Sequence, residues 1–522
     1  MKQNTEKKIR VAIVGAGVAG LTAGIYCLDQ GFDVALYEKN PYVGGECTGW
    51  SRNGTYIDGC AHWIIGTNPT SELYPLWHHI GIFDGHPKAY PTRYISKFKL
   101  SDGRIFTFYS DLKKLEEHAL ATFPSDKKVI QKIIRGIRAY MSILIPTDKP
   151  IDMMGPLSLT KFGLKMLPMF LTYVSARRES IAHLASQCND KELASVLLRF
   201  LEPDYNAHSL YYICAELAKD DSCVLEGGSK PMMERVAKRF LDRGGELHLA
   251  SPVKRVLFNE KNEAVGLELE KGDVIDADYV ITACDMEWTL HHLLENRFKD
   301  KIFEKQFAAR EAFPVNTSVL VSYRVSGDFS AFPYMLDVKT EPIDMFGKAM
   351  DHLPLRNFSF DPTLPSPLGT TSFTALLPAN EAVYDNLKAM DRKTYLEAKK
   401  RLGEAFIPAI SETLGVPPSA IELLDVATPL TLERYNHCYK GSYMAFLSTA
   451  KGFGLMRPGL LKGAKNFVMA GQWIMIPGGL PIALFSGKHA AIRICKMLKQ
   501  RFVNKESKKP ASVDPWLSFQ YA

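Results

Sequence analysis

The feature that most constrains this chain is an uncharged stretch near its start, which begins VAIVGAGVAGLTAG at residue 11. Three structures could contain it: a secretory signal, a membrane span, or the strand–turn–helix of a nucleotide-binding domain. The pattern continues past any cleavage site of a signal. Glycines also interrupt the run of about 20 apolar residues that a spanning helix needs. The nucleotide-binding interpretation alone explains the stretch residue by residue.

The spacing of the glycines indicates what this stretch binds. Residues 9–14 are rich in β-branched side chains, as expected for a strand buried on both faces. Gly15 then makes a tight turn, Gly17 lets the backbone approach a pyrophosphate, and Gly20 lets the following helix press on the strand. The free N–H groups at the start of that helix attract phosphate. The stretch therefore predicts a dinucleotide site.

The residues after the helix favour FAD over NAD. A second buried strand is predicted over residues 34–37, and Glu38 at its end is placed to accept hydrogen bonds from an adenosine ribose. Gly44 and Gly45 then offer a second close backbone approach to the same phosphates. An NAD-dependent domain would normally enter another crossover helix at this point, and this chain does not.

The bulk composition excludes several other classes. With 522 residues, of which 46% are hydrophobic, the chain should form two to four domains with a large core. Its net charge of +7 comes from 64 basic and 57 acidic residues, so no nucleic-acid partner is predicted. Nine cysteines without C-x-x-C pairs predict neither a metal site nor a disulfide framework. A cytoplasmic location follows.

Two distant segments complete the predicted cofactor site. Residues 225–284 read as a helix over 230–243, a Gly-Gly stop, and strands that end at 279–282. A second uncharged run, residues 466–487, is broken by Pro477 and Pro481, so no transmembrane segment is predicted. It divides instead into a strand, a glycine turn and a helix from near Leu480. The positive end of that helix suits the N1–C2=O edge of a reduced flavin.

These motifs resemble the FAD-dependent amine oxidase superfamily, and within it the phytoene desaturase, carotenoid isomerase and retinol saturase branch. The resemblance covers nearly the whole chain. It is strongest in the opening fingerprint with Gly44-Gly45, in residues 225–284, in ATPLTLERY (427–435), and in the GQW…PGGLP…FSG pattern that ends at Gly487. It implies an α/β fold: a Rossmann-like FAD-binding domain with a parallel sheet, discontinuous in sequence, and an α+β substrate domain of mixed sheet and helices.

The domain boundaries follow from the same resemblance. Residues 7–96, 225–295 and 425–500 are expected to form the FAD-binding domain, and residues 97–224 and 296–424 the substrate-binding domain. Residues 501–522 are expected to form a C-terminal tail.

The resemblance also implies the cofactor contacts. The implied FAD-binding residues are Gly15, Ala16, Gly17, Val18, Ala19, Gly20, Glu38, Lys39, Gly44, Gly45, Glu46, Cys47, Thr48, His62, Trp63, Val253, Cys284, Gly471, Gln472, Leu480, Pro481 and Ile482. Two of them depart from the family pattern. Glu46 stands where the family often has Arg or Ser, and its carboxylate is unfavourable beside a pyrophosphate unless it turns away. Gln472 replaces an acid but can still bond a ribityl hydroxyl.

On the substrate side, the apolar segment 155–180 allows two interpretations. Flanked by Lys161, Lys165 and Arg177, it could touch a membrane and admit an apolar substrate. The alternative, a buried core helix with a solvated basic end, is preferred because Pro168 interrupts the helix. The methionines near this segment could line a tunnel, although each one singly is better explained as core.

Candidate polar catalysts are few. His62 is the preferred histidine for a proton relay, although a structural or flavin-packing role is favoured over proton donation. Adjacent helical residues do not share a face, so a metal pair at His291-His292 is not expected. Tyr435 and His437 lie where the two domains should meet.

The leading hypothesis is an FAD-dependent oxidoreductase that acts on carbon–carbon bonds of a long hydrophobic polyene or isoprenoid, by hydride transfer with flavin N5. This is desaturase, saturase or isomerase chemistry of the carotenoid and retinoid type. The alternatives are a flavin amine oxidase, for which Trp473 could form one aromatic wall, and a flavin-binding protein without turnover. The expected partner is a hydrophobic small molecule, with peripheral membrane contact as an open alternative.

Overall fold

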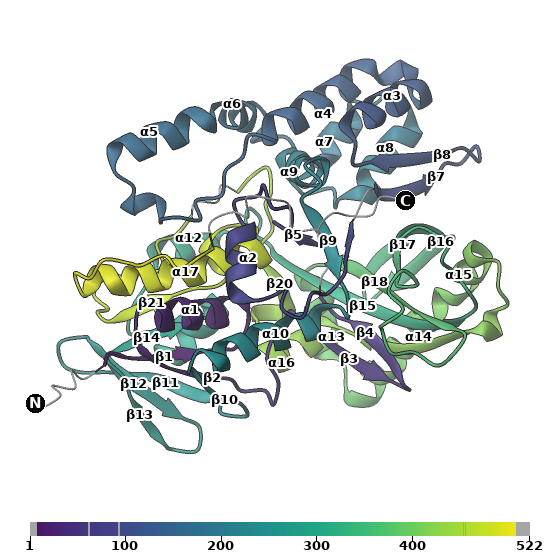
Figure 1. Ribbon diagram of the computed structural model, residues 1–522. Helices are drawn as coiled ribbons and strands as arrows, with labels where there is room; N and C mark the ends of the chain where they lie inside the picture. The colour runs from purple at the N-terminus through teal and green to yellow at the C-terminus, as the bar shows by residue number, and fades with distance from the viewer. Residues whose placement is uncertain (1–7, 61–62, 92–93, 453, 455, 508–522) are drawn as a thin grey trace, which may run out of the picture.

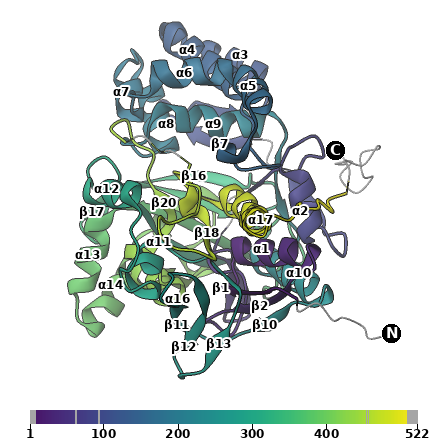
Figure 2. The same ribbon diagram turned by 90° about the vertical axis from the view of Figure 1, so that its left-hand side faces the viewer.

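The computed structural model describes residues 8–60, 63–91, 94–452, 454 and 456–507. Figure 1 shows two sheets side by side beneath a layer of helices, and the same layer stays on top in the quarter turn of Figure 2. Both sheets are built from segments that are far apart in the chain, whereas the helical layer comes from one continuous stretch, residues 112–218.

The first sheet is parallel and has, among the described residues, five strands in the order β10-β2-β1-β14-β21. Its strands are β1 (Arg10–Val14), β2 (Asp33–Tyr37), β10 (Glu246–His248), β14 (Tyr279–Thr282) and β21 (Phe467–Met469). The central strand β1 is apolar and buried because helices and a small sheet cover both faces. Four of these strands, β1, β2, β14 and β21, lie within a residue or two of their predicted positions, and the predicted fold class is confirmed.

Three helices pack beside this sheet: α1 (Val18–Asp29), α10 (Ser229–Asp242) and α17 (Leu480–Met497). The α1 and α17 helices approach so closely that a Cβ at Gly487 would lie 2.5 Å from the carbonyl oxygen of Ala19. A glycine is required there for packing alone. The antiparallel strands β11 (Val253–Phe258), β12 (Ala264–Leu269) and β13 (Val274–Asp276) form a small sheet beside β14.

The second sheet is mixed, with eight strands in the described part of the chain. Its strands are β7 (Tyr94–Lys99), β8 (Ile105–Tyr109), β15 (Val315–Ser326), β16 (Met335–Met345), β17 (Lys348–Asn357), β18 (Thr370–Ala379), β19 (Ile421–Ala427) and β20 (Ser442–Phe446). The helices α13 (Glu381–Ala389), α14 (Arg392–Ala405) and α15 (Ile407–Leu414) lie against it in Figure 1. β20 pairs with β15 in this mixed sheet, although residues 425–500 were assigned to the FAD-binding domain. The predicted domain boundaries stay a prediction.

The helical layer has its own core of buried Ile, Leu and Phe side chains. Its members are α3 (Leu112–Thr122), α4 (Lys127–Tyr140), α5 (Pro156–Lys165), α6 (Leu167–Ala176), α7 (Ile181–Ser186), α8 (Lys191–Phe200) and α9 (Ala207–Ala218). No helix in the residues that the structure describes is both long and apolar enough to cross a bilayer.

One expectation about local structure was wrong. The segment 155–180 is not a buried helix: it forms α5 and α6, and in these two helices only Ala176 is buried. Residues 501–507, the described part of the predicted tail, form no helix or strand but contact the first domain: Glu506 accepts a hydrogen bond from the Tyr26 hydroxyl at 2.6 Å and pairs with the buried Lys488. The remaining part of the predicted tail lies outside the described residues.

A cavity shared by the nucleotide-binding sheet and the helical layer

One cavity of about 930 Å³ runs between the two sheets and the helical layer. Its wall combines the ends of β1, β2 and β14 with residues of α6, α9 and β18. The volume lies at the upper end of the range for small-molecule sites, enough for more than one small occupant. One part of the cavity therefore lies at the carboxyl edge of the parallel sheet, where such folds bind their ligands. The other part, called the chamber below, lies between the helical layer and the mixed sheet.

The two glycine motifs meet at this edge. Gly17 and Gly44 form a backbone bridge, and the Gly44 N–H donates to the Ala16 carbonyl at 2.9 Å. A Cβ at Gly45 would lie 3.5 Å from the Gly17 Cα, and one at Gly20 would lie 1.9 Å from the Gly15 oxygen. Gly20 therefore allows the close approach of the helix to the turn, and the two glycine loops contact each other at the edge of the sheet.

Glu38 holds this loop in place. One carboxylate oxygen accepts from the Ala16 N–H at 2.9 Å, and the other accepts from the backbone and side-chain nitrogens of Asn40 at 2.8 and 2.9 Å. The side chain is buried and also lines the cavity. Because a carboxylate offers about four acceptor sites, these bonds leave room for a ribose hydroxyl. Glu38 is thus a loop-positioning residue as well as a predicted ribose ligand.

Two helices begin at the cavity. The residues that precede these helices, Gly17 before α1 and Gly479 before α17, have no side chain to cap them, and neither helix has an acidic residue in its first turn. Backbone N–H groups at a helix start carry partial positive charge and need partners. Since both starts face the same cavity, the site fits a ligand with a negatively charged part and a polar ring edge, as FAD has.

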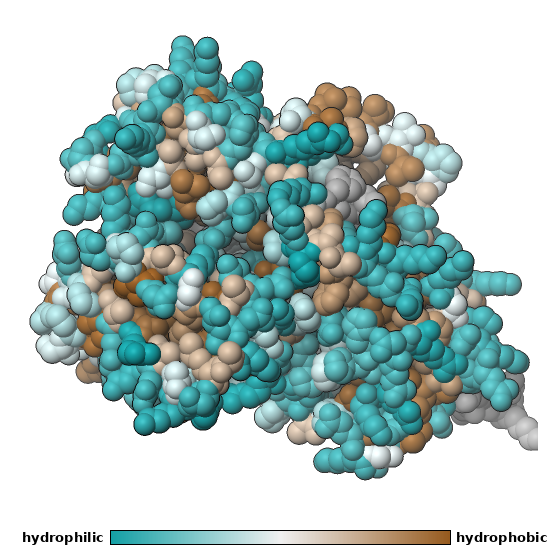
Figure 3. Space-filling model, turned by 180° about the vertical axis from the view of Figure 1, so that it is seen from behind, coloured by the Kyte–Doolittle hydropathy of each residue, from teal (hydrophilic) through white to brown (hydrophobic). Residues whose placement is uncertain are grey.

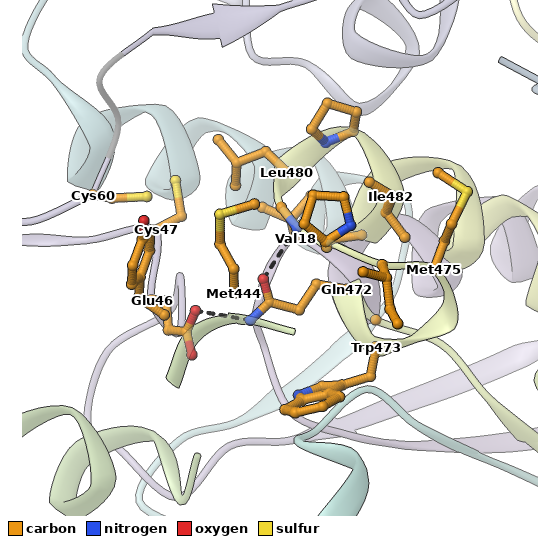
Figure 4. Close-up of a pocket in the computed structure, with 18 of the residues that line it drawn as sticks. Val18, Glu46, Cys47, Cys60, Met444, Gln472, Trp473, Met475, Leu480 and Ile482 are labelled. Carbon is orange, nitrogen blue, oxygen red and sulfur yellow. Dashed lines mark hydrogen bonds between the residues drawn. The ribbon is translucent and has the colours of Figure 1, made fainter. Parts of the chain in front are cut away.

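Glu46 and Gln472, the two departures from the family pattern, bond to each other. In Figure 4 the side-chain amide of Gln472 points toward Glu46: its nitrogen donates to Glu46 Oε2 at 3.0 Å, and its oxygen accepts from the Gly479 N–H at 3.2 Å. Burial raises the pKa of the Glu46 carboxyl group to about 8, partly opposed by the Gln472 hydrogen bond. Glu46 therefore does turn away from the glycine loop, toward α17.

Asp285, a second carboxyl group on the cavity wall, was missed by the sequence analysis. It caps α11 (Met286–Trp288) by accepting from the N–H groups of Glu287 and Trp288 at 2.8 and 3.1 Å. Burial raises its pKa to about 7, opposed by these N–H bonds. Its position directly after Cys284, at the carboxyl end of a parallel strand, is the signal that could have identified it.

The structure brings nearly all of the predicted cofactor residues to the cavity. Those that line it are Gly15, Gly17, Val18, Ala19, Glu38, Lys39, Gly44, Gly45, Glu46, Cys47, Thr48, Trp63, Val253, Cys284, Gly471, Gln472, Leu480, Pro481 and Ile482. Ala16 and Gly20 sit behind the loop, where they support it. His62, the candidate proton relay, lies outside the described residues.

Tyr435 and His437 also line the cavity. The His437 ring lies against Trp288, with ring centroids 3.9 Å apart. Burial lowers the pKa of His437 to about 4, and the charges of Lys39 and His292 lower it further. His437 is therefore neutral at physiological pH, and its observed role is packing.

Away from the glycine loops the wall is mainly apolar. Side chains from the helical layer and the mixed sheet form it: Ile143, Leu144, Phe162, Met166, Met169, Phe170, Tyr173, Phe200, Ile213, Leu320, Met335 and Leu376. Met153 and Met154 are not among the described residues of this wall. Trp473 touches the cavity, but its ring packs edge-on against the Phe446 ring, with ring centroids 5.0 Å apart, and points away from Gln472.

This parallel sheet, with paired glycine loops and two helix starts over one cavity, defines a dinucleotide-binding protein of the Rossmann type. Comparison with known families goes further: residues 18–495 match the family described as "Flavin containing amine oxidoreductase", and the chain belongs to that family. The prediction of FAD as the cofactor is thereby confirmed, as is the resemblance to this superfamily.

Individual relatives include desaturases of carotenoid type. The chain is 26% identical to a phytoene desaturase (neurosporene-forming) of Rhodobacter capsulatus over 57% of its own length, and it spans little more than half, 56%, of that relative. It is 21% identical to a 4,4'-diapophytoene desaturase of Methylomonas sp over 94% of this chain and 96% of the relative. A solved putrescine oxidase is 14% identical with a TM-score of 0.58, covering 94% of this chain and all of the other, which shows a common fold.

Proposed function

We propose that this protein is an FAD-dependent oxidoreductase that acts on carbon–carbon bonds of a long hydrophobic polyene or isoprenoid. The observation that carries the proposal is the continuity of the cavity, in which uncapped helix starts and glycine loops adjoin a chamber walled by Phe, Met, Leu and Ile. Such a wall contributes apolar contacts to an extended hydrocarbon. The similarity to carotenoid desaturases supports the same substrate class.

Different residues of the chain would bind the different parts of FAD. The loops at Gly15–Gly17 and Gly44–Gly45 hold the pyrophosphate, Glu38 takes the ribose, and the start of α17 holds the ring system. When bound, the flavin supplies N5 as the atom that accepts or donates a hydride. The apolar wall positions the substrate carbons and excludes water. Replacing Glu38 by Gln should reduce FAD retention on a desalting column; unchanged retention would remove Glu38 from this role.

An amine oxidase is less well supported. A site for a neutral amine would need aromatic walls beside the reactive edge, and Trp473 is instead packed into the core against Phe446 and Phe303.

Flavin absorbance under anaerobic conditions tests the proposal. Oxidised holoprotein is mixed with a carotenoid polyene or with benzylamine, and the dithionite-reduced form is mixed with the same compounds. We expect the polyene alone to change the flavin spectrum, by bleaching the oxidised form or reoxidising the reduced one. A response to the amine alone would favour the amine oxidase, and a response to neither would refute turnover of both classes.

The α5 and α6 helices support a further part of the proposal, contact with a membrane. Together they expose large apolar side chains: Leu157, Leu159, Leu164, Leu167, Phe170, Leu171 and Val174, with exposed fractions from 45 to 71%. Figure 3 shows brown atoms gathered at the upper right, where these helices lie when seen from behind. The exposed Lys161, Lys165, Arg177 and Arg178 surround them. An apolar face with a basic border suits an anionic lipid surface.

This apolar face is also a wall of the cavity, because Phe162, Met166, Met169 and Phe170 line it from inside. A substrate that is dissolved in a bilayer would then enter through α5 and α6. We expect the protein to sediment with vesicles of phosphatidylcholine and phosphatidylglycerol, and the Leu164→Asp/Leu171→Asp variant to stay in solution. Leu396→Asp, at an apolar side chain on α14 that is 46% exposed, is the matched control. Equal sedimentation of both variants would contradict membrane contact through this face.

A further inference from the structure

One stretch of the wall of the apolar chamber carries several charged side chains. It is formed where α8 meets strands β7, β16 and β17, and its lining residues are Ser96, Arg199, Glu202, Asp337 and His352. Figure 1 shows α8 beside β7 and β8 at one end of the helical layer, with α5 at the other end. The polar stretch therefore lies apart from the apolar face through which substrate is proposed to enter.

Arg199 is the central group of this stretch. Its side chain is 7% exposed, and it forms a hydrogen-bonded ion pair with Asp337, which is 4% exposed. The guanidinium also lies over the Phe98 ring, 5.2 Å from the ring centroid. Only Nη1 is used by Asp337: among the described residues, the buried Nε and Nη2 have no hydrogen-bond partner.

Unpartnered donors of this kind are unusual in a folded interior. A buried guanidinium with two unused N–H edges loses its hydration without replacement, which costs stability. Arg199 presents Nε and Nη2 as a fork on one edge, which can grip an oxygen acceptor. An acceptor that arrives with a ligand would restore the lost hydrogen bonds.

The charges around Arg199 decide which kind of acceptor fits. Arg199 is already neutralised by Asp337, and the neighbouring Glu202 is paired with Lys348 at 2.7 Å. Asp351 and His352 pair with each other at 2.8 Å at the same end. A carboxylate would therefore add an unbalanced negative charge to a site that is shielded from water. A neutral oxygen can accept from Nε and Nη2 without that penalty.

We propose that the substrate carries a hydroxyl or carbonyl oxygen at one end, and that this oxygen binds Arg199 while the polyene lies along the apolar wall. The proposal rests on the proposed function and narrows its substrate class from hydrocarbons to oxygenated polyenes. Arg199 would then fix which carbon–carbon bond faces the flavin, because the polar end anchors the chain at one point of the cavity.

Binding of matched ligands to the holoprotein tests this. Retinol, retinal, retinoic acid and the parent hydrocarbon axerophthene share one polyene and differ at the end group. Quenching of tryptophan fluorescence reports their binding, because Trp50, Trp63 and Trp288 line the cavity. We expect retinol and retinal to bind about tenfold more tightly than the hydrocarbon and the acid, from two added hydrogen bonds.

The paired variant Arg199→Met/Asp337→Leu removes both charges and keeps the volume. It should bind the hydrocarbon at least as tightly as wild type and lose the preference for the oxygenated ends. Arg135→Met, at an exposed arginine on α4, is the control and should keep that preference.

The outcomes separate the two proposals. Hydrocarbon that binds wild type as tightly as retinol would refute the anchor and leave the proposed function standing. Acid that binds more tightly than retinol would overturn the choice of a neutral oxygen. If none of the four ligands binds, the polyene function itself fails, and the anchor with it. The comparison in wild type needs no variant, so a variant that misfolds does not block the test.

Discussion

The carboxyl group of Glu46 should link the affinity for FAD to pH. This group accepts a hydrogen bond from Gln472, and burial, together with the nearby Asp285 carboxyl group, raises its pKa to about 8. In the proposed arrangement the pyrophosphate brings further negative charge to the same cavity. The bound state therefore favours the neutral acid, and the free protein must take up a proton when FAD binds at high pH.

The magnitude follows from proton linkage. Below about pH 7 the carboxyl group is already neutral, so its titration does not affect the Kd for FAD. Above its pKa of about 8 the Kd should rise close to tenfold for each pH unit. From about pH 7 to about pH 9 we therefore expect the Kd to increase about tenfold, which corresponds to ~1.4 kcal/mol.

Quenching of flavin fluorescence on titration with apoprotein measures this Kd. The Glu46→Gln variant keeps the shape of the neutral acid and cannot ionise, so its Kd should rise less than that of wild type over the same range. The part of the rise that remains belongs to Asp285, whose pKa is about 7. The control is Asp285→Asn, which removes the neighbouring carboxylate and leaves Glu46 to titrate. A wild-type Kd that stays constant, or a parallel loss of affinity in Glu46→Gln, would refute the reasoning.

Stability of the apoprotein gives an independent measure of the same group. The folded pKa of Glu46 lies above the ordinary value of 4.5, so the folded state binds more protons than the unfolded chain between these values. Its contribution to folding is therefore lost as pH rises from about 4.5 to about 8. The Glu46→Gln apoprotein should have a higher Tm than wild type near pH 9, and nearly the same Tm near pH 4.

Two further predictions concern stability. Glu506→Gln leaves the buried Lys488 without its charged partner and should lower the free energy of unfolding by ~3–5 kcal/mol in urea titrations, whereas the exposed neighbour Lys505→Gln should change it little. A helix–helix contact is tested by Gly487→Ala, whose Cβ would meet the backbone of α1; a loss of ~1–3 kcal/mol is expected. Gly163→Ala on α5, where a Cβ meets nothing within 4 Å, should instead raise stability slightly, and equal effects of the two alanines would contradict the packing argument.

The parts of this protein that short-range geometry dictates could be predicted from the sequence. A close approach of backbone to phosphate, or of helix to strand, admits only glycine, so the spacing of Gly15, Gly17 and Gly20 is enough to identify the motif. A strand buried on both faces is similarly marked by its β-branched residues. Four strands of the parallel sheet, the two glycine loops and the start of α17 were therefore predicted nearly to the residue.

Only the tertiary structure decided which side chains share an environment. Glu46 and Gln472 are 426 positions apart, and neither residue alone indicates that they bond. For α5 and α6 the sequence analysis preferred a buried core helix and was wrong, since periodicity does not say whether another layer covers a helix. The Arg199–Asp337 pair joins a helix to a distant strand. Two nitrogens of Arg199 lack a hydrogen-bond partner among the described residues because the fold shields them from water. Burial and charge pairing depend on the whole chain, whereas the glycine motifs depend on their immediate neighbours.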